Sequence, residues 1–184
     1  MSWKDRRVLI TGLSGFVGSY MGEYLVEQGA NVFGLVRRRA DGHISRHIRD
    51  RRLDDKAHLL TGDLLDPASL LGAIDESQPA VIFHLAAQSS APRSFQFPGE
   101  TYEVNSTGTL NLLEAIRLKK ISPTFLFAGT SEEYGLVFGS ETHYLEYKDK
   151  HGPVFPEPAS LPELPIKETN PLRPISPYGV AKVH

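Results

Sequence analysis

The sequence predicts an α/β fold with a doubly wound parallel sheet and helices on both faces. Short apolar runs without polar alternation recur up to Ala128, as is typical of strands buried on both sides. Helix-like stretches separate these runs, with caps or glycines at their ends. Because parallel strands require crossover connections, such helices cover the two faces of one sheet.

The strands and helices follow in order along the chain. We expect strands at residues 8–10, 32–36, 58–60, 80–85 and 124–128. The first helix ends near Gly29, and a second begins at Asp66 and Pro67, which are suited to the N-cap and the first turn. The helix after Pro98 carries one apolar stripe of Val104, Gly108, Leu112, Ala115 and Ile116, with Leu110 and Leu113 off it, so we expect burial on two sides.

Periodicity is lost between Ser131 and Ser176. The stretch from Pro153 to Pro177 contains eight prolines, so no strand or long helix can run through it. We interpret residues 131–176 as a lid or substrate-side loop within one domain covering residues 1–184. For residues 138–165, a plain surface insertion is an equally good interpretation.

Composition excludes several classes of function. Lys and Arg number 20 against 22 Asp and Glu, so no global field favours nucleic acid or a membrane. The absence of cysteine excludes disulfides and thiolate chemistry. No signal peptide follows Met1 and no run could span a bilayer, which predicts a cytoplasmic protein. His43 and His47 have no third ligand nearby, so we expect no metal site.

A glycine-rich turn follows the first strand. Its glycines, Gly12, Gly15 and Gly18, recur at every third position, and Ser14, Phe16 and Val17 lie between them. Glycine allows a sharp turn and a close approach to a pyrophosphate, and a helix N-terminus attracts its charge. Although an ordinary turn can contain three glycines, their place between strand and helix favours dinucleotide binding in a Rossmann-type fold.

Basic residues follow the second strand, at the position where an acidic residue would bind the ribose of NAD. Arg37, Arg38 and Arg39 stand there, and guanidinium groups can bind a 2′-phosphate in bidentate fashion. The sequence therefore predicts NADP(H), with NAD(H) less favoured. The alternative is a solvated basic loop.

The ends of the third and fourth strands carry further candidates. Asp63, before Leu64, either accepts from an adenine amine or caps a turn. The small residues of Leu85-Ala86-Ala87-Gln88 let a flat ring or a pyrophosphate approach the main chain, whereas His84 is interpreted as a core histidine.

Tyr178 and Lys182 are four residues apart, which places them on one helical face. An ammonium group there would lower the pKa of the phenol, so that it could exchange a proton with a carbinol. Thr130 can bind the substrate hydroxyl beside Tyr178, and Glu132 could act as a second base. A polar turn is the alternative, and for Glu133 we expect a water-facing side chain.

Together these motifs resemble the extended short-chain dehydrogenase/reductase family of sugar-nucleotide epimerases, dehydratases and reductases. The motifs are Gly12-x-x-Gly15-x-x-Gly18, Gly62-Asp63-Leu64, His84-Leu85-Ala86-Ala87-Gln88, Asn105-x-x-Gly108-Thr109 and Ser176-Pro177-Tyr178-Gly179-x-x-Lys182, and they cover nearly the whole chain. The closest resemblance is to the GDP-mannose 4,6-dehydratase branch. Phe16 and Val17 depart from that branch, which usually has Gln-Asp there.

The resemblance implies site residues in three sets. The catalytic set is Thr130, Glu132, Tyr178 and Lys182. The substrate-binding set is Gln88, Ser89, Ser90, Thr130, Ser131 and Glu132. The cofactor-binding set is Gly12, Ser14, Gly15, Phe16, Val17, Gly18, Arg37, Arg38, Asp63, Leu64, Leu85, Ala86, Ala87, Tyr178 and Lys182.

The resemblance also implies a reaction and its alternatives. Oxidation at C4 of GDP-mannose would acidify the C5 proton, Glu132 would remove it, and water would leave from C6. A GDP-4-keto-6-deoxymannose reductase is the nearest alternative and a 4-epimerase the next; a catalytically silent NADP-binding module is the alternative from another class. The family continues beyond Lys182 into a substrate lobe and forms homodimers or tetramers, so we expect a truncated chain that is inactive alone.

Overall fold

The chain is described by a computed structural model of residues 2–37 and 44–184. It divides into two compact units. Unit 1 consists of Met1–Ala87 and Glu103–Ala128, and unit 2 of Gln88–Tyr102 and Gly129–His184.

Unit 1 is built on a parallel sheet of five strands, which confirms the predicted fold class. The strands are β1 (Arg7–Thr11), β2 (Asn31–Val36), β3 (His58–Thr61), β4 (Val81–His84) and β5 (Thr124–Phe127), in the spatial order β3-β2-β1-β4-β5. Thr11 pairs with Leu35 on one side and with His84 on the other. The carboxyl ends of the central strands therefore lie together at one edge, where open α/β sheets bind ligands.

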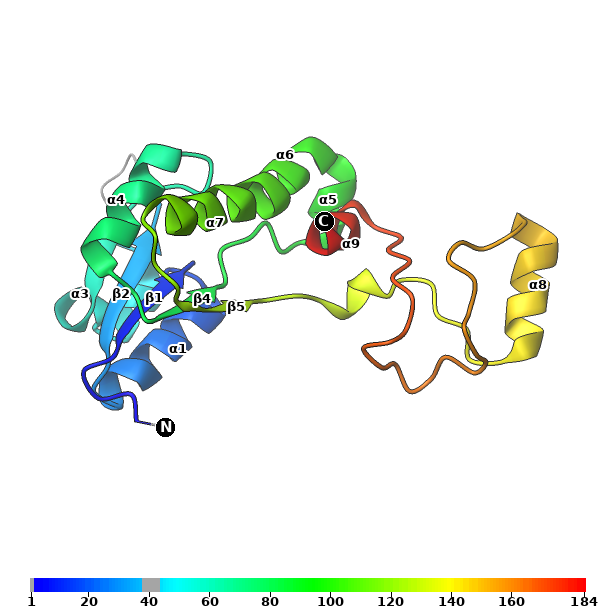
Figure 1. Cartoon of the computed structure of the whole chain (residues 1–184), viewed down its shortest axis with the longest axis horizontal. Helices are drawn as coiled ribbons and strands as arrows, with labels where there is room; N and C mark the ends of the chain where they lie inside the picture. Colours follow the sequence, from blue (N-terminus) through cyan, green and yellow to red (C-terminus); the bar gives the residue numbers. More distant parts are fainter. Residues whose placement is uncertain (1, 38–43) are drawn as a thin grey trace. The chain divides into compact units, whose positions relative to one another are not determined.

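Helices cover this sheet on both faces. They are α1 (Phe16–Glu27), α2 (Arg46–Asp50), α3 (Leu53–Lys56), α4 (Pro67–Ser77), the π-helix η1 (Glu103–Thr107) and α7 (Gly108–Leu118). Figure 1 shows α4 and α7 on the opposite side of the sheet from α1. One core joins Leu9 to α4 and α7, and a second joins Val8 and Ile10 to α1 and α3. No helix formed by the described residues is long and apolar enough to cross a bilayer.

Helix α4 begins as the sequence predicts. The Asp66 carboxylate accepts hydrogen bonds from the main-chain N–H groups of Ala68 and Ser69, and Pro67 occupies the first turn. These contacts satisfy donors that a helix start leaves unpaired. The cap fixes the chain directly after the end of β3.

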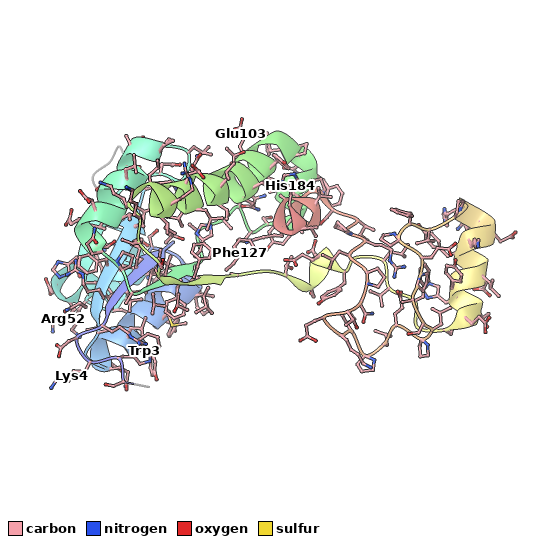
Figure 2. The ribbon with its side chains drawn as sticks, in the orientation of Figure 1. Trp3, Lys4, Arg52, Glu103, Phe127 and His184 are labelled. Carbon is pink, nitrogen blue, oxygen red and sulfur yellow. The ribbon has the colours of Figure 1, made fainter. Side chains whose placement is uncertain are left out.

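Two expectations of burial are wrong. Leu110 and Leu113 of α7 are 57% and 43% exposed, so only the predicted stripe of this helix faces the core. On β5, Leu126 is 49% and Phe127 38% exposed; Figure 2 labels Phe127 at the end of this strand. The reason is that β5 is an edge strand, and within the described residues of unit 1 no helix follows it.

Unit 2 contains short helices and long loops. Its elements are α5 (Ala91–Gln96), α6 (Pro98–Tyr102), the 3₁₀ helix η2 (Ser131–Glu133), α8 (Glu141–His151) and α9 (Pro177–Val183). Residues 152–176 form no helix or strand beyond the isolated bridge between Gly135 and Arg173, as the prolines predict.

Helix α8, which Figure 1 shows in yellow and orange, was not predicted. Its N-cap Ser140 accepts from the His143 N–H at 3.1 Å. The rings of His143, Tyr144 and Tyr147, at helical spacing, contact Phe138. The helix thus packs through aromatic rings against one side chain rather than through an aliphatic stripe, and aliphatic periodicity could not reveal it.

A buried ion pair fixes the proline-rich loop. Glu163 and Arg173 are 5% and 6% exposed and bind each other through the carboxylate and the guanidinium group. The second carboxylate oxygen of Glu163 accepts from the Phe138 N–H at 2.9 Å, and the Arg173 guanidinium lies over the Phe138 ring. These contacts hold the loop three residues before Ser176, where α9 starts.

Substitution by alanine should change the free energy of unfolding in opposite directions at two glycines of unit 1. A Cβ at Gly34 in β2 would lie 2.8 Å from Leu13 Cβ, whereas at Gly72 in α4 nothing lies within 4 Å. We expect Gly34→Ala to lower the free energy of unfolding by about 1–3 kcal/mol through overpacking. Gly72→Ala should raise it by about 0.5–1 kcal/mol because glycine weakens a helix interior. Urea unfolding followed by circular dichroism measures both, and an equal loss in the two variants would contradict this packing.

Candidate active site

The glycine-rich turn after β1 is held by close main-chain contacts. Gly12 has a φ of +77°, and a Cβ there would lie 2.8 Å from the main-chain nitrogen of Ala86. A Cβ at Gly18 would lie 2.2 Å from the Gly12 carbonyl oxygen. Only glycine fits either position without a main-chain shift, so helix α1 starts directly against the end of the strand.

The start of α1 offers an anion site of the kind that a pyrophosphate needs. Gly15 is its N-cap, and within the described residues no side chain caps the first turn. Phe16 and Val17 in that turn are 65% and 57% exposed. Ser14 directs its carbonyl oxygen to the Ser45 hydroxyl at 2.9 Å, so its main chain is fixed by the loop after β2. A helix N-terminus with accessible N–H groups fits a phosphate group.

The basic residues after β2 are only partly described. Arg37 is exposed directly after the strand end, whereas Arg38, Arg39 and His43 lie outside the described residues. Among the described residues, no group of three or more histidine, aspartate or glutamate side chains could hold a metal ion.

Asp63 and Leu64 after β3 take up structural contacts. Asp63 Oδ1 accepts from the Leu65 N–H at 2.9 Å, which is the turn-capping alternative. Leu64 is 6% exposed and belongs to the core beside Gly108. Its side chain therefore supports α7, and only its main chain remains for a cofactor.

The end of β4 is fixed by a buried histidine. His84 is 2% exposed, and its Nδ1 and Nε2 lie 2.7 Å and 2.9 Å from the hydroxyls of Thr11 and Thr109. This confirms the interpretation of a core histidine. Thr11 Oγ1 also accepts from the Ala86 N–H at 3.1 Å. Leu85, Ala86 and Ala87 are thereby held as a half-buried segment beside the glycine-rich turn.

The proposed substrate segment Gln88–Ser90 belongs to unit 2 and is internally bonded. Gln88 Oε1 accepts from the Ser90 N–H at 2.7 Å, and Gln88 Nε2 donates to Thr101 Oγ1 at 3.0 Å. Ser90 caps α5 by accepting from the Arg93 N–H, and Ser89 is exposed. The Gln88 side-chain amide thus fixes the main chain of residues 88–90 through these hydrogen bonds.

Thr130 and Glu133 form a capping box around η2. The Thr130 hydroxyl accepts from the Glu132 N–H at 3.3 Å, and Glu133 Oε1 accepts from the Thr130 N–H at 2.8 Å. The expectation that Glu133 faces water is wrong, because its carboxylate satisfies a donor of the 3₁₀ turn. The pattern Thr-x-x-Glu at residues 130–133 is the signal that identifies this box. Ser131 is exposed on the same turn.

Helix α9 packs against η2 and brings Tyr178 to Thr130. Ser176, its N-cap, donates its hydroxyl to Glu132 Oε2 at 2.6 Å and accepts from the Gly179 N–H at 3.0 Å. A Cβ at Gly179 would lie 2.7 Å from the Glu132 carbonyl oxygen. A side-chain hydrogen bond joins Thr130 and the Tyr178 phenol. Unit 2 therefore gathers Thr130, Glu132 and Tyr178, as expected from the sequence.

The electrostatics of this cluster differ from the expectation. Burial raises the pKa of the Tyr178 phenol, the hydrogen bond from Thr130 opposes this rise, and the carboxylates of Glu132 and Glu133 add to it. Burial also lowers the pKa of Lys182, against the opposing charge of Glu133. The net shift of the Tyr178 pKa is therefore upward, opposite to the predicted direction, because desolvation and two carboxylates outweigh the effects that lower it. Lys182, on the same helix, is 8% exposed.

The raised pKa of Tyr178 can be measured by absorbance titration of tyrosinate. Subtracting the titration of Tyr178→Phe from that of the wild type should place the pKa of this phenol above the value of about 10 that an exposed tyrosine has. Since the folded pKa lies above the unfolded value, the phenol contributes stability below pH about 10 that is lost as the pH rises through the folded pKa. A tyrosinate that forms below pH about 10 in the cofactor-free chain would exclude this environment.

Known proteins resemble the chain in sequence and fold. The family model for GDP-mannose 4,6 dehydratase matches residues 9–154. GDP-mannose 4,6-dehydratases of Yersinia enterocolitica and Homo sapiens are each 37% identical, over 97% and 98% of this chain and 43% and 44% of their own length. RMD from Pseudomonas aeruginosa, solved with NADPH, has 30% identity and a TM-score of 0.64 over 97% of this chain and 46% of its own. UDP-glucose 4-epimerase of Thermotoga maritima has 29% identity and a TM-score of 0.68 over 96% of this chain and 47% of its own.

The chain spans less than half the length of these relatives. The matched region nevertheless includes the glycine-rich turn, the strand ends of unit 1 and the capping box of unit 2. On this match, the chain belongs to the GDP-mannose 4,6-dehydratase family.

Proposed function

We propose that this chain is the cofactor-binding part of an NADP(H)-dependent nucleotide-sugar 4,6-dehydratase that acts on GDP-mannose. The observation that carries the proposal is the position of Glu132. It lies two residues after Thr130, and its carboxylate accepts from Ser176 at the start of the helix that carries Tyr178. A carboxylate beside a Thr-Tyr pair supplies the second base that dehydration requires. The names of the sequence relatives support GDP-mannose as the substrate.

Unit 1 fits a dinucleotide. The tight Gly12–Gly18 turn brings the first turn of α1 to the carboxyl edge of the sheet, where it can bind a pyrophosphate. The glycine-rich turn, the half-buried segment Leu85–Ala87 and the turn at Asp63 lie along that edge. Arg37 and Arg38 supply charge for a 2′-phosphate, which favours NADP(H), the cofactor with which RMD was solved.

The glycine-rich turn, Leu85–Ala87 and Arg37 would hold NADP⁺, which would supply reversible hydride transfer to the sugar. Tyr178 would take the proton of the C4 hydroxyl, and Thr130 would hold the phenol through its hydrogen bond. Glu132 would remove the C5 proton, which the neighbouring ketone acidifies, and water would leave from C6. Lys182, buried on the same helix face, supplies positive charge that supports the phenolate.

The reductase and epimerase alternatives do not need a base at C5. Glu132→Gln in the full-length protein should therefore abolish deuterium incorporation at C5 and formation of the 4-keto-6-deoxy sugar from GDP-mannose. NMR of the product in deuterated water measures both, with Glu141→Gln on exposed α8 as a matched control that keeps both signals. Retention of most activity by Glu132→Gln on a 4-keto substrate would instead support a reductase. Absence of any turnover by the wild type would support a silent NADP-binding module.

The choice of cofactor depends on the two arginines after β2. We expect Arg37→Asp combined with Arg38→Ile to weaken NADP(H) binding by tenfold or more, about 1.4 kcal/mol, and NAD(H) binding much less, because only NADP(H) carries the 2′-phosphate. Fluorescence titration with both reduced cofactors provides the comparison. Arg46→Asp, in a side chain 84% exposed, controls for the greater part of the change in net charge. An equal loss of affinity for the two cofactors would contradict the assignment of Arg37 and Arg38 to the 2′-phosphate.

A further inference from the structure

Ser176 is bonded on both sides of its hydroxyl group. The residue is 5% exposed, and its Oγ accepts from the Gly179 N–H at 3.0 Å while donating to Glu132 Oε2 at 2.6 Å. A hydroxyl has one proton, so the acceptor role toward Gly179 leaves this proton for the carboxylate. One buried side chain therefore joins the start of α9 to η2.

This bond selects one oxygen of Glu132. A hydrogen bond from a hydroxyl to an ionised carboxylate is short and strong, and 2.6 Å lies within its usual range. Because the Ser176 hydroxyl engages Oε2, the rotation of the carboxyl group is restricted. Oε1 is then the oxygen that would take a proton from a substrate.

We propose that Ser176 is a positioning residue that holds the Glu132 carboxylate in a fixed position relative to the Tyr178 phenol. This assignment rests on the proposed function of Glu132 as the base at C5. Because the same hydroxyl caps the helix on which Tyr178 stands two residues later, the two proposed proton-transfer groups share one anchor.

The close packing of η2 and α9 supports this role. A Cβ at Gly179 would lie only 2.7 Å from the carbonyl oxygen of Glu132, so the main chains of the two elements are in direct contact. Ser140, the N-cap of α8, provides a comparison, since it accepts from the His143 N–H at 3.1 Å in the same way. Among the described residues no carboxylate accepts from the Ser140 hydroxyl, so capping and positioning can be separated.

The first test is kinetic and uses the full-length protein with GDP-mannose and NADP⁺. We expect Ser176→Ala to lower kcat and C5 deuterium incorporation by about tenfold or more, because a carboxylate that can rotate is misplaced for proton transfer. KM for GDP-mannose should stay within about twofold, since no binding contact is removed. Ser176→Thr keeps the hydroxyl and should restore most of kcat, and Ser140→Ala should leave kcat unchanged.

The second test needs no turnover. In a double-mutant cycle of Ser176→Ala and Glu132→Ala, the loss of the cap to Gly179 occurs in both backgrounds and cancels. We expect the drop in urea midpoint of the double variant to be smaller than the sum of the two single drops. The same cycle with Ser140→Ala should be additive.

The outcomes separate this assignment from the proposed function. Additive losses in the Ser176–Glu132 cycle, or a Ser176→Ala variant with unchanged kcat in an active protein, would overturn the positioning role while the dehydratase proposal stands. A wild-type protein without turnover would overturn the proposed function and this role together. A lowered kcat that Ser176→Thr does not restore would show that the hydroxyl at this position is not what sustains kcat, which also excludes the role.

Discussion

The contact between the main chains of Gly12 and Gly18 is the constraint on which unit 1 depends. A Cβ at Gly18 would lie 2.2 Å from the Gly12 carbonyl oxygen, so β1 and α1 are joined as closely as a peptide chain allows. A Cβ at Gly12 would lie 2.8 Å from the main-chain nitrogen of Ala86. The turn is thus clamped between α1 and the end of β4, and the open N-terminus of α1 lies at the carboxyl edge of the sheet, where a dinucleotide can bind.

Close main-chain contact at a glycine also organises unit 2, where it brings together the side chains of the candidate site. Gly179 lets α9 touch the carbonyl oxygen of Glu132, and the hydroxyls of Thr130 and Ser176 then connect η2 to the helix. The cost is electrostatic, because the carboxylates of Glu132 and Glu133 together with burial hold the phenol of Tyr178 in its protonated form.

Much of the fold could be predicted because it depends on short-range patterns. Apolar runs without alternation located all five strands, and Asp66-Pro67 located the start of α4. The exposure of Leu126 and Leu113 could not be predicted, since it depends on which elements cover an edge strand and a helix face. Helix α8 was missed because its packing uses rings around Phe138, which sequence periodicity does not register.

The candidate site shows a similar division. The spacing of Tyr178 and Lys182, the strand end before Thr130 and Glu132, and the family resemblance predicted Thr130, Glu132 and Tyr178, which unit 2 brings together. Their electrostatics could not be predicted, because the spacing of Tyr178 and Lys182 says nothing about how deeply each is buried. The capping role of Glu133 could have been predicted from the sequence, since Thr-x-x-Glu is a capping pattern. The contact between Ser176 and Glu132 joins residues 44 positions apart and required the structure.

Hydrogen–deuterium exchange of the folded chain with and without NADPH tests most directly whether the glycine-rich turn of unit 1 anchors a dinucleotide. We expect NADPH to slow amide exchange at residues 12–18 and 85–87, where the cofactor would cover the main chain, and to leave α8 unchanged. Unchanged exchange in the glycine-rich turn at saturating NADPH, in a chain shown to be folded, would contradict this anchoring.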